Sequence, residues 1–92
     1  MAMSDANLPG AELIEAGLAD LTTGTETDEA LLVSIAAPRL RALGFDVPPP
    51  FADAELRLYH RLAARYGAGA HARYNALVRR LVSFQRAAAC AR

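Results

Sequence analysis

Lysine and tryptophan are absent from this 92-residue chain, and cysteine occurs once, at Cys90. A single cysteine excludes an internal disulfide, and no apolar run reaches the roughly 18 residues that a membrane-spanning helix needs. The first residues, Met-Ala-Met-Ser-Asp, lack the basic and apolar stretches of a signal peptide. We therefore expect a cytoplasmic protein in a reducing compartment, with no membrane association.

Positive charge is absent from the first part of the chain. All ten positive charges are arginines, beginning at Arg39, and the last acidic residue is Glu55. Residues 1–38 carry a net charge of −7 and residues 39–92 carry +7. Such a division indicates an electrostatic partner, either within the molecule or outside it.

What is present is a globular composition, with 53% hydrophobic and 22% charged residues. A chain of this length forms one small domain that buries roughly 60–65% of its unfolded surface. A core of that size leaves little margin of stability, so oligomerisation would help.

The spacing of apolar residues predicts an all-α fold, a small four- to five-helix bundle. The first helix begins at residue 11 and ends before Gly24, and the second begins near Thr25 or Thr27, where a threonine hydroxyl can cap it. Residues 30–37 are apolar almost all round, which favours a buried helix, although a strand over 31–35 is the alternative. The residues that form the buried stripe of the first helix are Leu13, Ile14, Gly17, Leu18 and Leu21.

Pro38 suits the first turn of a short third helix, which Gly44 ends with Phe45 placed against Leu40. Three prolines at 48–50 then predict a stiff polyproline spacer. The predicted organisation is a disordered lead (1–10), an acidic helical half (11–45), a proline-rich spacer (46–52), an arginine-rich helical hairpin (53–86) and a frayed tail (87–92).

The C-terminal half predicts two antiparallel helices. Asp53 caps a helix over residues 54–66, Gly67-Ala68-Gly69 breaks it, and a second helix covers residues 70–86. The expected buried side chains are Leu56, Tyr59, Leu62, Ala63 and Tyr66 on the first of these helices, and Tyr74, Leu77, Val78, Leu81, Phe84 and part of Val82 on the second.

Arginines line several faces of this hairpin. Arg57, Arg61 and Arg65 follow at i, i+4 and i+8, so they form one row in which like charges repel each other. Three explanations remain open: the acidic first helix neutralises the row within the monomer, a second subunit does so, or a polyanion binds. The candidate anion-binding or partner-binding residues are Arg57, Arg61, Arg65, Arg73, Arg79 and Arg80.

No signature of catalysis, metal binding or cofactor binding stands out. His60 and His71 lie eleven residues apart, and together with Cys90 they match no zinc-site spacing. The Gly67-Ala68-Gly69 turn lacks the lysine of a phosphate-binding loop. We expect no catalytic, metal-binding or cofactor-binding residues, no cofactor and no small-molecule substrate.

The favoured interpretation is a small non-enzymatic protein–protein interaction module that self-associates. Its expected partner is a second copy of the chain, in a homodimer or larger homo-oligomer, or another protein. Its motivation is the small core, a second helix that needs apolar cover on every side, and charge halves that complement each other. The alternative is a nucleic-acid-binding helical hairpin, in which the six candidate arginines contact phosphates.

Overall fold

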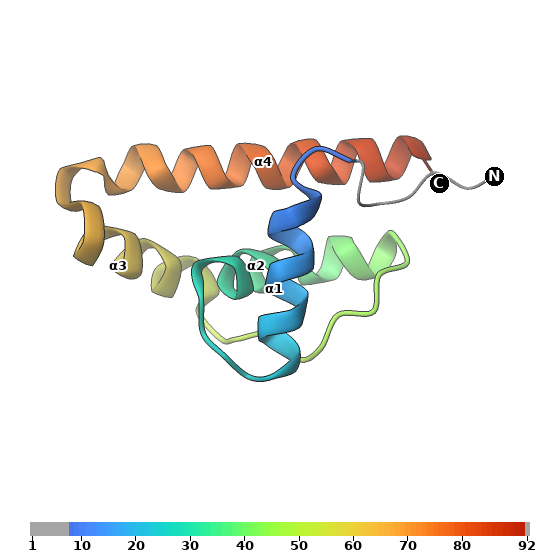
Figure 1. Ribbon diagram of the computed structural model, residues 1–92, viewed down its shortest axis with the longest axis horizontal. Helices are drawn as coiled ribbons and strands as arrows, with labels where there is room; N and C mark the ends of the chain where they lie inside the picture. Colours follow the sequence, from blue (N-terminus) through green and yellow to red (C-terminus); the bar gives the residue numbers. More distant parts are fainter. Residues whose placement is uncertain (1–7, 92) are drawn as a thin grey trace.

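In this computed structural model, residues 8–91 are described, and they are all-α, with no strand among them. The helices are α1 (Ala11–Thr22), α2 (Asp28–Ala42), α3 (Ala54–Tyr66) and α4 (Ala70–Ala91), with a 3₁₀ turn (Gly67–Gly69) between the last two (Figure 1). The predicted all-α class is confirmed, and residues 31–35 are helical. None of the helices in residues 8–91 has the length and apolarity that crossing a membrane requires.

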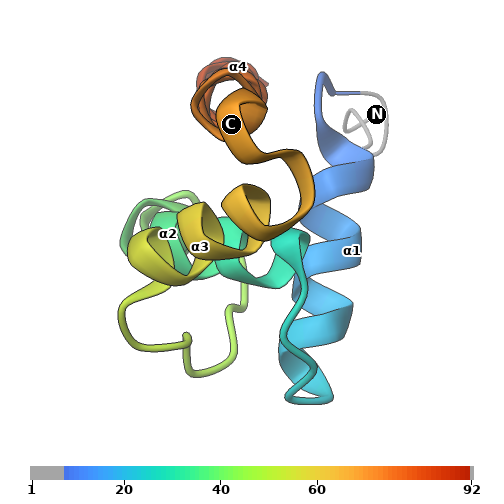
Figure 2. The same cartoon turned by 90° about the vertical axis from the view of Figure 1, so that its left-hand side faces the viewer.

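Helix α2 lies at the centre, and α1, α3 and α4 all pack against it. Figure 2 shows α1 and α4 on different sides of α2, while α3 leads back toward α4 through the tight turn. Leu31, Leu32 and Val33 point in three successive directions around the helix, and all are fully buried. The cover that this apolar segment needs therefore comes from the same chain, and not from a partner.

Close contact between α1 and α2 depends on Gly17. A Cβ atom at this position would lie 2.4 Å from both the Glu29 carbonyl oxygen and the Val33 Cγ2 atom. Ile14 and Leu21 are buried on the same side of α1, as predicted. The apolar stripe of α1 thus includes a gap that the backbone of α2 fills.

The turn between α1 and α2 is closed at both ends by hydrogen bonds. Gly24 adopts a φ of 73°, and the next N–H, from Thr25, donates to the Asp20 carbonyl oxygen at 2.8 Å. Thr27 caps α2, as its Oγ1 accepts from the Ala30 N–H at 3.0 Å and donates to Asp20 Oδ2 at 2.8 Å. Thr27 is therefore the cap, of the two threonines considered.

Pro38 does not begin a separate helix, contrary to expectation, because α2 continues through it to Ala42. A proline inside a helix costs about 3 kcal/mol. The burial of Ala37 and Leu40 on either side of it offsets this cost. The predicted ending is confirmed: Gly44 has a φ of 97°, and the Phe45 N–H donates to the Leu40 carbonyl oxygen at 3.0 Å.

The proline-rich segment folds back along α2 and does not separate the two halves of the chain. The Phe51 N–H donates to the buried Ser34 Oγ at 3.0 Å. Arg41 Nη2 donates to the carbonyl oxygens of Val47 and Pro48 at 3.1 and 3.3 Å. These contacts hold the expected stiff spacer against α2, and the three prolines by themselves did not predict them.

The ends of the described chain are more ordered than expected. Of the predicted lead, residues 1–7 lie outside the described residues, whereas Leu8 is buried and Gly10 is the N-cap of α1. Helix α4 continues to Ala91 where a frayed tail was expected, because Ala88 is fully buried one turn after Phe84. The last residue, Arg92, is not described.

Candidate functional site

The arginine row of α3 binds two carboxylates at the start of α2. Arg57 Nη1 lies 3.1 Å from Glu26 Oε1. Arg61 Nε lies 2.8 Å from Asp28 Oδ1, and Arg65 Nη1 lies 2.9 Å from Asp28 Oδ2. Asp28 therefore bridges two arginines that are one helical turn apart.

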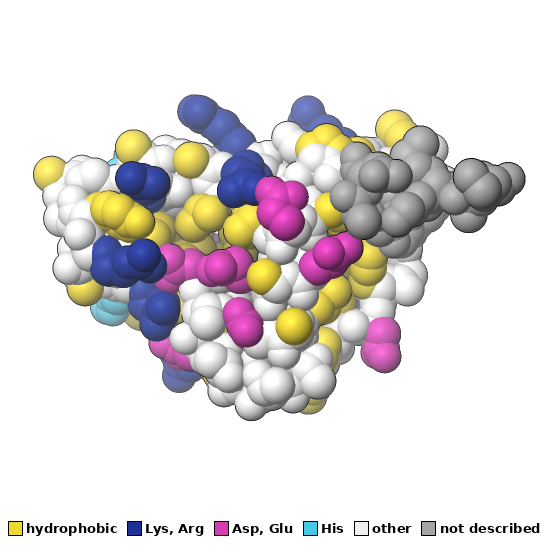
Figure 3. All heavy atoms as spheres, viewed as in Figure 1, with side chains coloured by type: hydrophobic (Ala, Val, Ile, Leu, Met, Phe, Trp, Pro, Cys, Tyr) yellow, Lys and Arg dark blue, Asp and Glu magenta, His cyan; other side chains and the backbone are white. Residues whose placement is uncertain are grey.

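These two acids do not belong to the first helix, which was expected to supply them. Glu26 precedes α2 and Asp28 opens it, so α1 supplies none of the carboxylates that meet the row. The contribution of α1 is Glu12, which pairs with Arg80 of α4. These four arginines are therefore neutralised within the monomer, but the carboxylates that meet the row are not those of the first helix, as the first explanation expected. On the face drawn in Figure 3, dark-blue and magenta side chains accordingly lie beside one another.

The six candidate arginines do not form a single site. Arg73 lies over the Tyr66 ring, 4.3 Å from its centroid, and Arg65 lies 5.4 Å from the same centroid. Arg79 is exposed and forms no ion pair with any described residue. Arg65 thus joins the row to Arg73 through the Tyr66 ring, whereas Arg80 pairs with Glu12 and Arg79 stands apart from both.

The buried face of α3 differs from the predicted one. Leu58 and Leu62 face the core, as does Ala54, whereas Leu56 is 58% exposed and Tyr59 is 38% exposed. The helix is rotated so that the arginine row meets Glu26 and Asp28, and this rotation turns the aromatic stripe outward. Of the five expected side chains Leu62 is buried and Ala63 is partly buried; Leu56, Tyr59 and Tyr66 are exposed.

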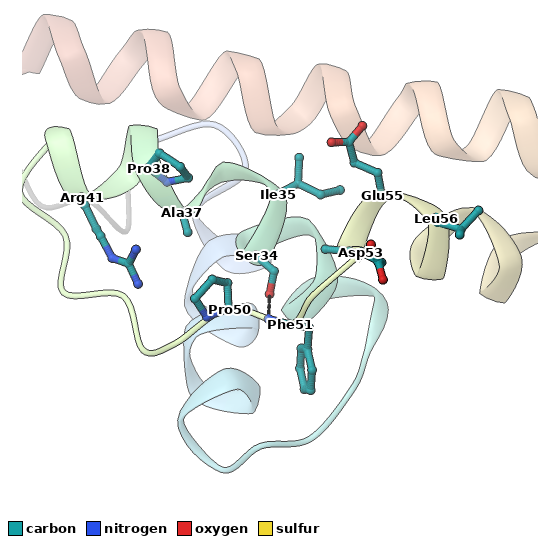
Figure 4. Close-up of a pocket in the computed structure, with 11 residues that line it drawn as sticks. Ser34, Ile35, Ala37, Pro38, Arg41, Pro50, Phe51, Asp53, Glu55 and Leu56 are labelled. Atoms are coloured by element: carbon teal, nitrogen blue, oxygen red, sulfur yellow. Dashed lines mark hydrogen bonds between the residues drawn. The ribbon is translucent and has the colours of Figure 1, made fainter.

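Beside the exposed stripe lies an open pocket of about 440 Å³. Figure 4 shows Ile35 of α2 and Glu55 of α3 pointing toward α4, with Leu56 at one side. Pro38 and Phe51 supply further apolar walls. Every buried side-chain nitrogen or oxygen in residues 8–91 has a hydrogen-bond partner. The pocket thus combines apolar walls with the charged side chains of Arg41, Asp53 and Glu55.

The stripe continues onto α4 through two tyrosines. The rings of Tyr59 and Tyr74 lie 5.9 Å apart at a tilted angle. Partial burial raises the pKa of the Tyr74 hydroxyl above its ordinary value, and the carboxylate of Glu55 raises it further. The side of α3 that carries Leu56 and Tyr59 is consequently joined to one side of α4.

The two histidines belong to no metal-binding group of side chains among the described residues. His60 and His71 are both exposed, and His71 Nε2 lies 3.2 Å from Asn75 Nδ2. Within residues 8–91, no three His, Cys, Asp or Glu side chains are close enough to hold a metal ion together. The sequence did not predict the pocket, and Leu56, which lines it, was expected on the buried face of α3. The available signal was that α3 carries two apolar stripes, one with Leu58 and one with Leu56.

Comparison of the chain with protein-family models, with curated proteins and with solved structures gave no match.

Proposed function

We propose that this protein is a small non-enzymatic protein–protein interaction module that self-associates. The observation that supports this function is the exposed apolar flank of α3, where Leu56 and Tyr59 lie beside a mostly apolar pocket. Contiguous exposed apolar surface commonly marks an interaction site. A chain this small also gains stability from any contact that covers such a surface.

The observation that supports self-association is not the one on which the sequence-based prediction rested. That prediction rested on complementary charges and on an apolar helix in need of cover. The acidic and basic parts of the chain already pair internally, through Glu26, Asp28 and Glu12. The apolar segment of α2 is already covered, except at Ile35, which is partly buried and lines the pocket. Association through the flank of α3 should therefore be driven by apolar burial, with charge contributing at the edges.

Light scattering over a range of protein concentrations, at low and at high salt, tests this function. Because apolar contacts are not screened by salt, we expect a dimer at high micromolar concentration under both conditions. A strict monomer in both solutions contradicts self-association. A dimer that dissociates fully at high salt shows instead that charge drives the contact.

The competing proposal is a nucleic-acid-binding hairpin. Arg73 and Arg79 form no ion pair among the described residues, so contact with phosphates would break no ion pair of theirs, although Arg73 lies over the Tyr66 ring. Arg57, Arg61 and Arg65 would have to leave Glu26 and Asp28, whose charges also repel a polyanion. Fluorescence polarisation with a generic duplex and with a single strand tests this proposal. A salt concentration of about 50 mM is chosen because low salt favours electrostatic binding. Micromolar affinity there supports this proposal, and its absence from both probes removes it.

A further inference from the structure

One side of α4 extends the apolar flank of α3. Tyr74, Val78 and Val82 are spaced at i, i+4 and i+8, so they share one side of the helix. Tyr74 contacts Tyr59 of α3, which fixes that side next to the exposed stripe. Val78 and Val82 are half-buried, and neither belongs to the side chains that pack against the core. We call this surface the α3–α4 face, and its residues are Leu56, Tyr59, Tyr74, Val78 and Val82.

The two sides of the α3–α4 face carry opposite charges. Asp53 and Glu55 lie at the beginning of α3, beside the pocket. On α4, Arg79 directly follows Val78 and Arg86 lies seven residues further along the same edge. None of these four side chains forms an ion pair with a described residue, although the arginines of the opposite flank of α3 all do. Arg41 of α2 lines the end of the pocket away from Glu55 (Figure 4), where it donates to the carbonyl oxygens of Val47 and Pro48.

This arrangement is complementary to itself. A two-fold axis parallel to α4 places the α3 side of one copy against the α4 side of the other. Leu56 then meets Val78 and Val82 of the second copy, and Glu55 approaches Arg79 of the second copy. A two-fold axis perpendicular to α4 would bring like charges together, α3 side against α3 side, which is unfavourable.

We propose that the α3–α4 face binds a second copy of itself about a two-fold axis parallel to α4. The apolar side chains drive the contact, and the Glu55–Arg79 pairs select its orientation. Each pair occurs twice in the dimer, because the interface is the same patch on both copies. This inference rests on the proposed self-association and adds to it the surface, the occupant and the orientation.

The first experiment changes the centre of the face. Leu56→Asp is compared with Ala64→Asp, which adds the same charge to an exposed position of α3 on the opposite flank. Leu56→Asp replaces an apolar side chain with a charge on both copies of the interface, so it should weaken dimerisation at least about tenfold. Ala64→Asp should leave it unchanged. Sedimentation equilibrium gives both constants, and circular dichroism confirms that each variant is folded.

The second experiment tests the orientation by exchanging charges. Arg79→Glu and Glu55→Arg should each weaken dimerisation, because each single variant places two like-charged pairs at the interface. The double variant should recover at least part of the lost affinity, since each pair is restored in reversed order. A double variant that dimerises no better than the weaker single variant overturns the proposed axis.

The outcomes separate this inference from the function on which it rests. A wild-type dimer that persists unchanged in Leu56→Asp overturns the α3–α4 face and leaves self-association standing. A wild-type chain that is monomeric throughout overturns both. Loss of the dimer in Leu56→Asp alone, with recovery in the charge exchange, supports the face and its orientation.

Discussion

The two flanks of α3 differ in how completely the fold uses them. On one flank Arg57, Arg61 and Arg65 all reach carboxylates of the same chain, and Asp28 between them is only 15% exposed. On the other flank Leu56 and Tyr59 remain exposed beside a pocket. A row of charges that was expected to need a partner is satisfied within the chain, while an apolar stripe that was expected in the core is exposed.

This difference shows that the polarity of a surface does not by itself identify the interaction site. What matters is whether the groups on it already have partners. The arginine flank is a closed set of ion pairs, so binding there must first break existing contacts. The apolar flank has no such cost, because its side chains exchange only water for a partner.

The largest effect expected is a contrast between two leucines of the same helix. Leu58→Ala removes a fully buried side chain and should lower the free energy of unfolding by about 2–5 kcal/mol. Leu56→Ala should change it by no more than about 0.5 kcal/mol at protein concentrations where the chain is monomeric. Urea denaturation of both variants measures the difference. Equal losses would show that Leu56 is part of the core.

The next largest effect is expected at Gly17, where α1 packs closely against α2. Helix propensity alone predicts that Gly17→Ala stabilises by about 1 kcal/mol. The 2.4 Å approach of its Cβ to the Glu29 carbonyl oxygen predicts the opposite, a loss of about 1–3 kcal/mol. The sign of the change in thermal midpoint decides between them. Ala16→Gly, at the exposed neighbouring position, serves as the control for propensity.

A smaller effect is expected from the ion pairs themselves. Pairs this close to solvent contribute about 0.2–1 kcal/mol, so a double-mutant cycle of Asp28→Asn and Arg61→Gln should give a coupling energy in that range. The coupling should shrink at 1 M salt, where the screening length is roughly 3 Å. Arg79→Gln, at an arginine with no ion pair among the described residues, should leave the stability of the monomer unchanged. A coupling energy of zero at low salt would mean that the Asp28–Arg61 ion pair does not stabilise the fold.

The smallest effect concerns Tyr74, where the apolar flank meets α4. Burial and Glu55 hold its pKa above the ordinary value of about 10, so the fold favours the neutral phenol. The stability that this adds is complete below about pH 10, and it is lost as the pH rises through the pKa of the folded state. Ultraviolet titration, with Tyr74→Phe as the reference, should show one tyrosine ionising late. Glu55→Gln should move that ionisation to lower pH.

Local features of the fold could be predicted from the sequence because they depend on neighbouring residues. Thr27 caps α2, Gly24 and Gly44 end their helices, and the Phe45 N–H returns to the Leu40 carbonyl oxygen. Each of these follows from the geometry of one helix end. The candidate surface was not predictable in this way, because it depends on which stripe of α3 faces inward.

The sequence alone determined the helical class, the helix ends at Gly24, Thr27 and Gly44, and the division of charge between the two parts of the chain. The tertiary structure decided where that charge goes and which apolar stripe is buried. The physical reason is that α3 has two stripes of similar hydrophobicity, containing Leu58 and Leu56, and its own sequence does not choose between them. The choice was made by contacts with α2, where burying Leu58 also brings the arginine row to Glu26 and Asp28.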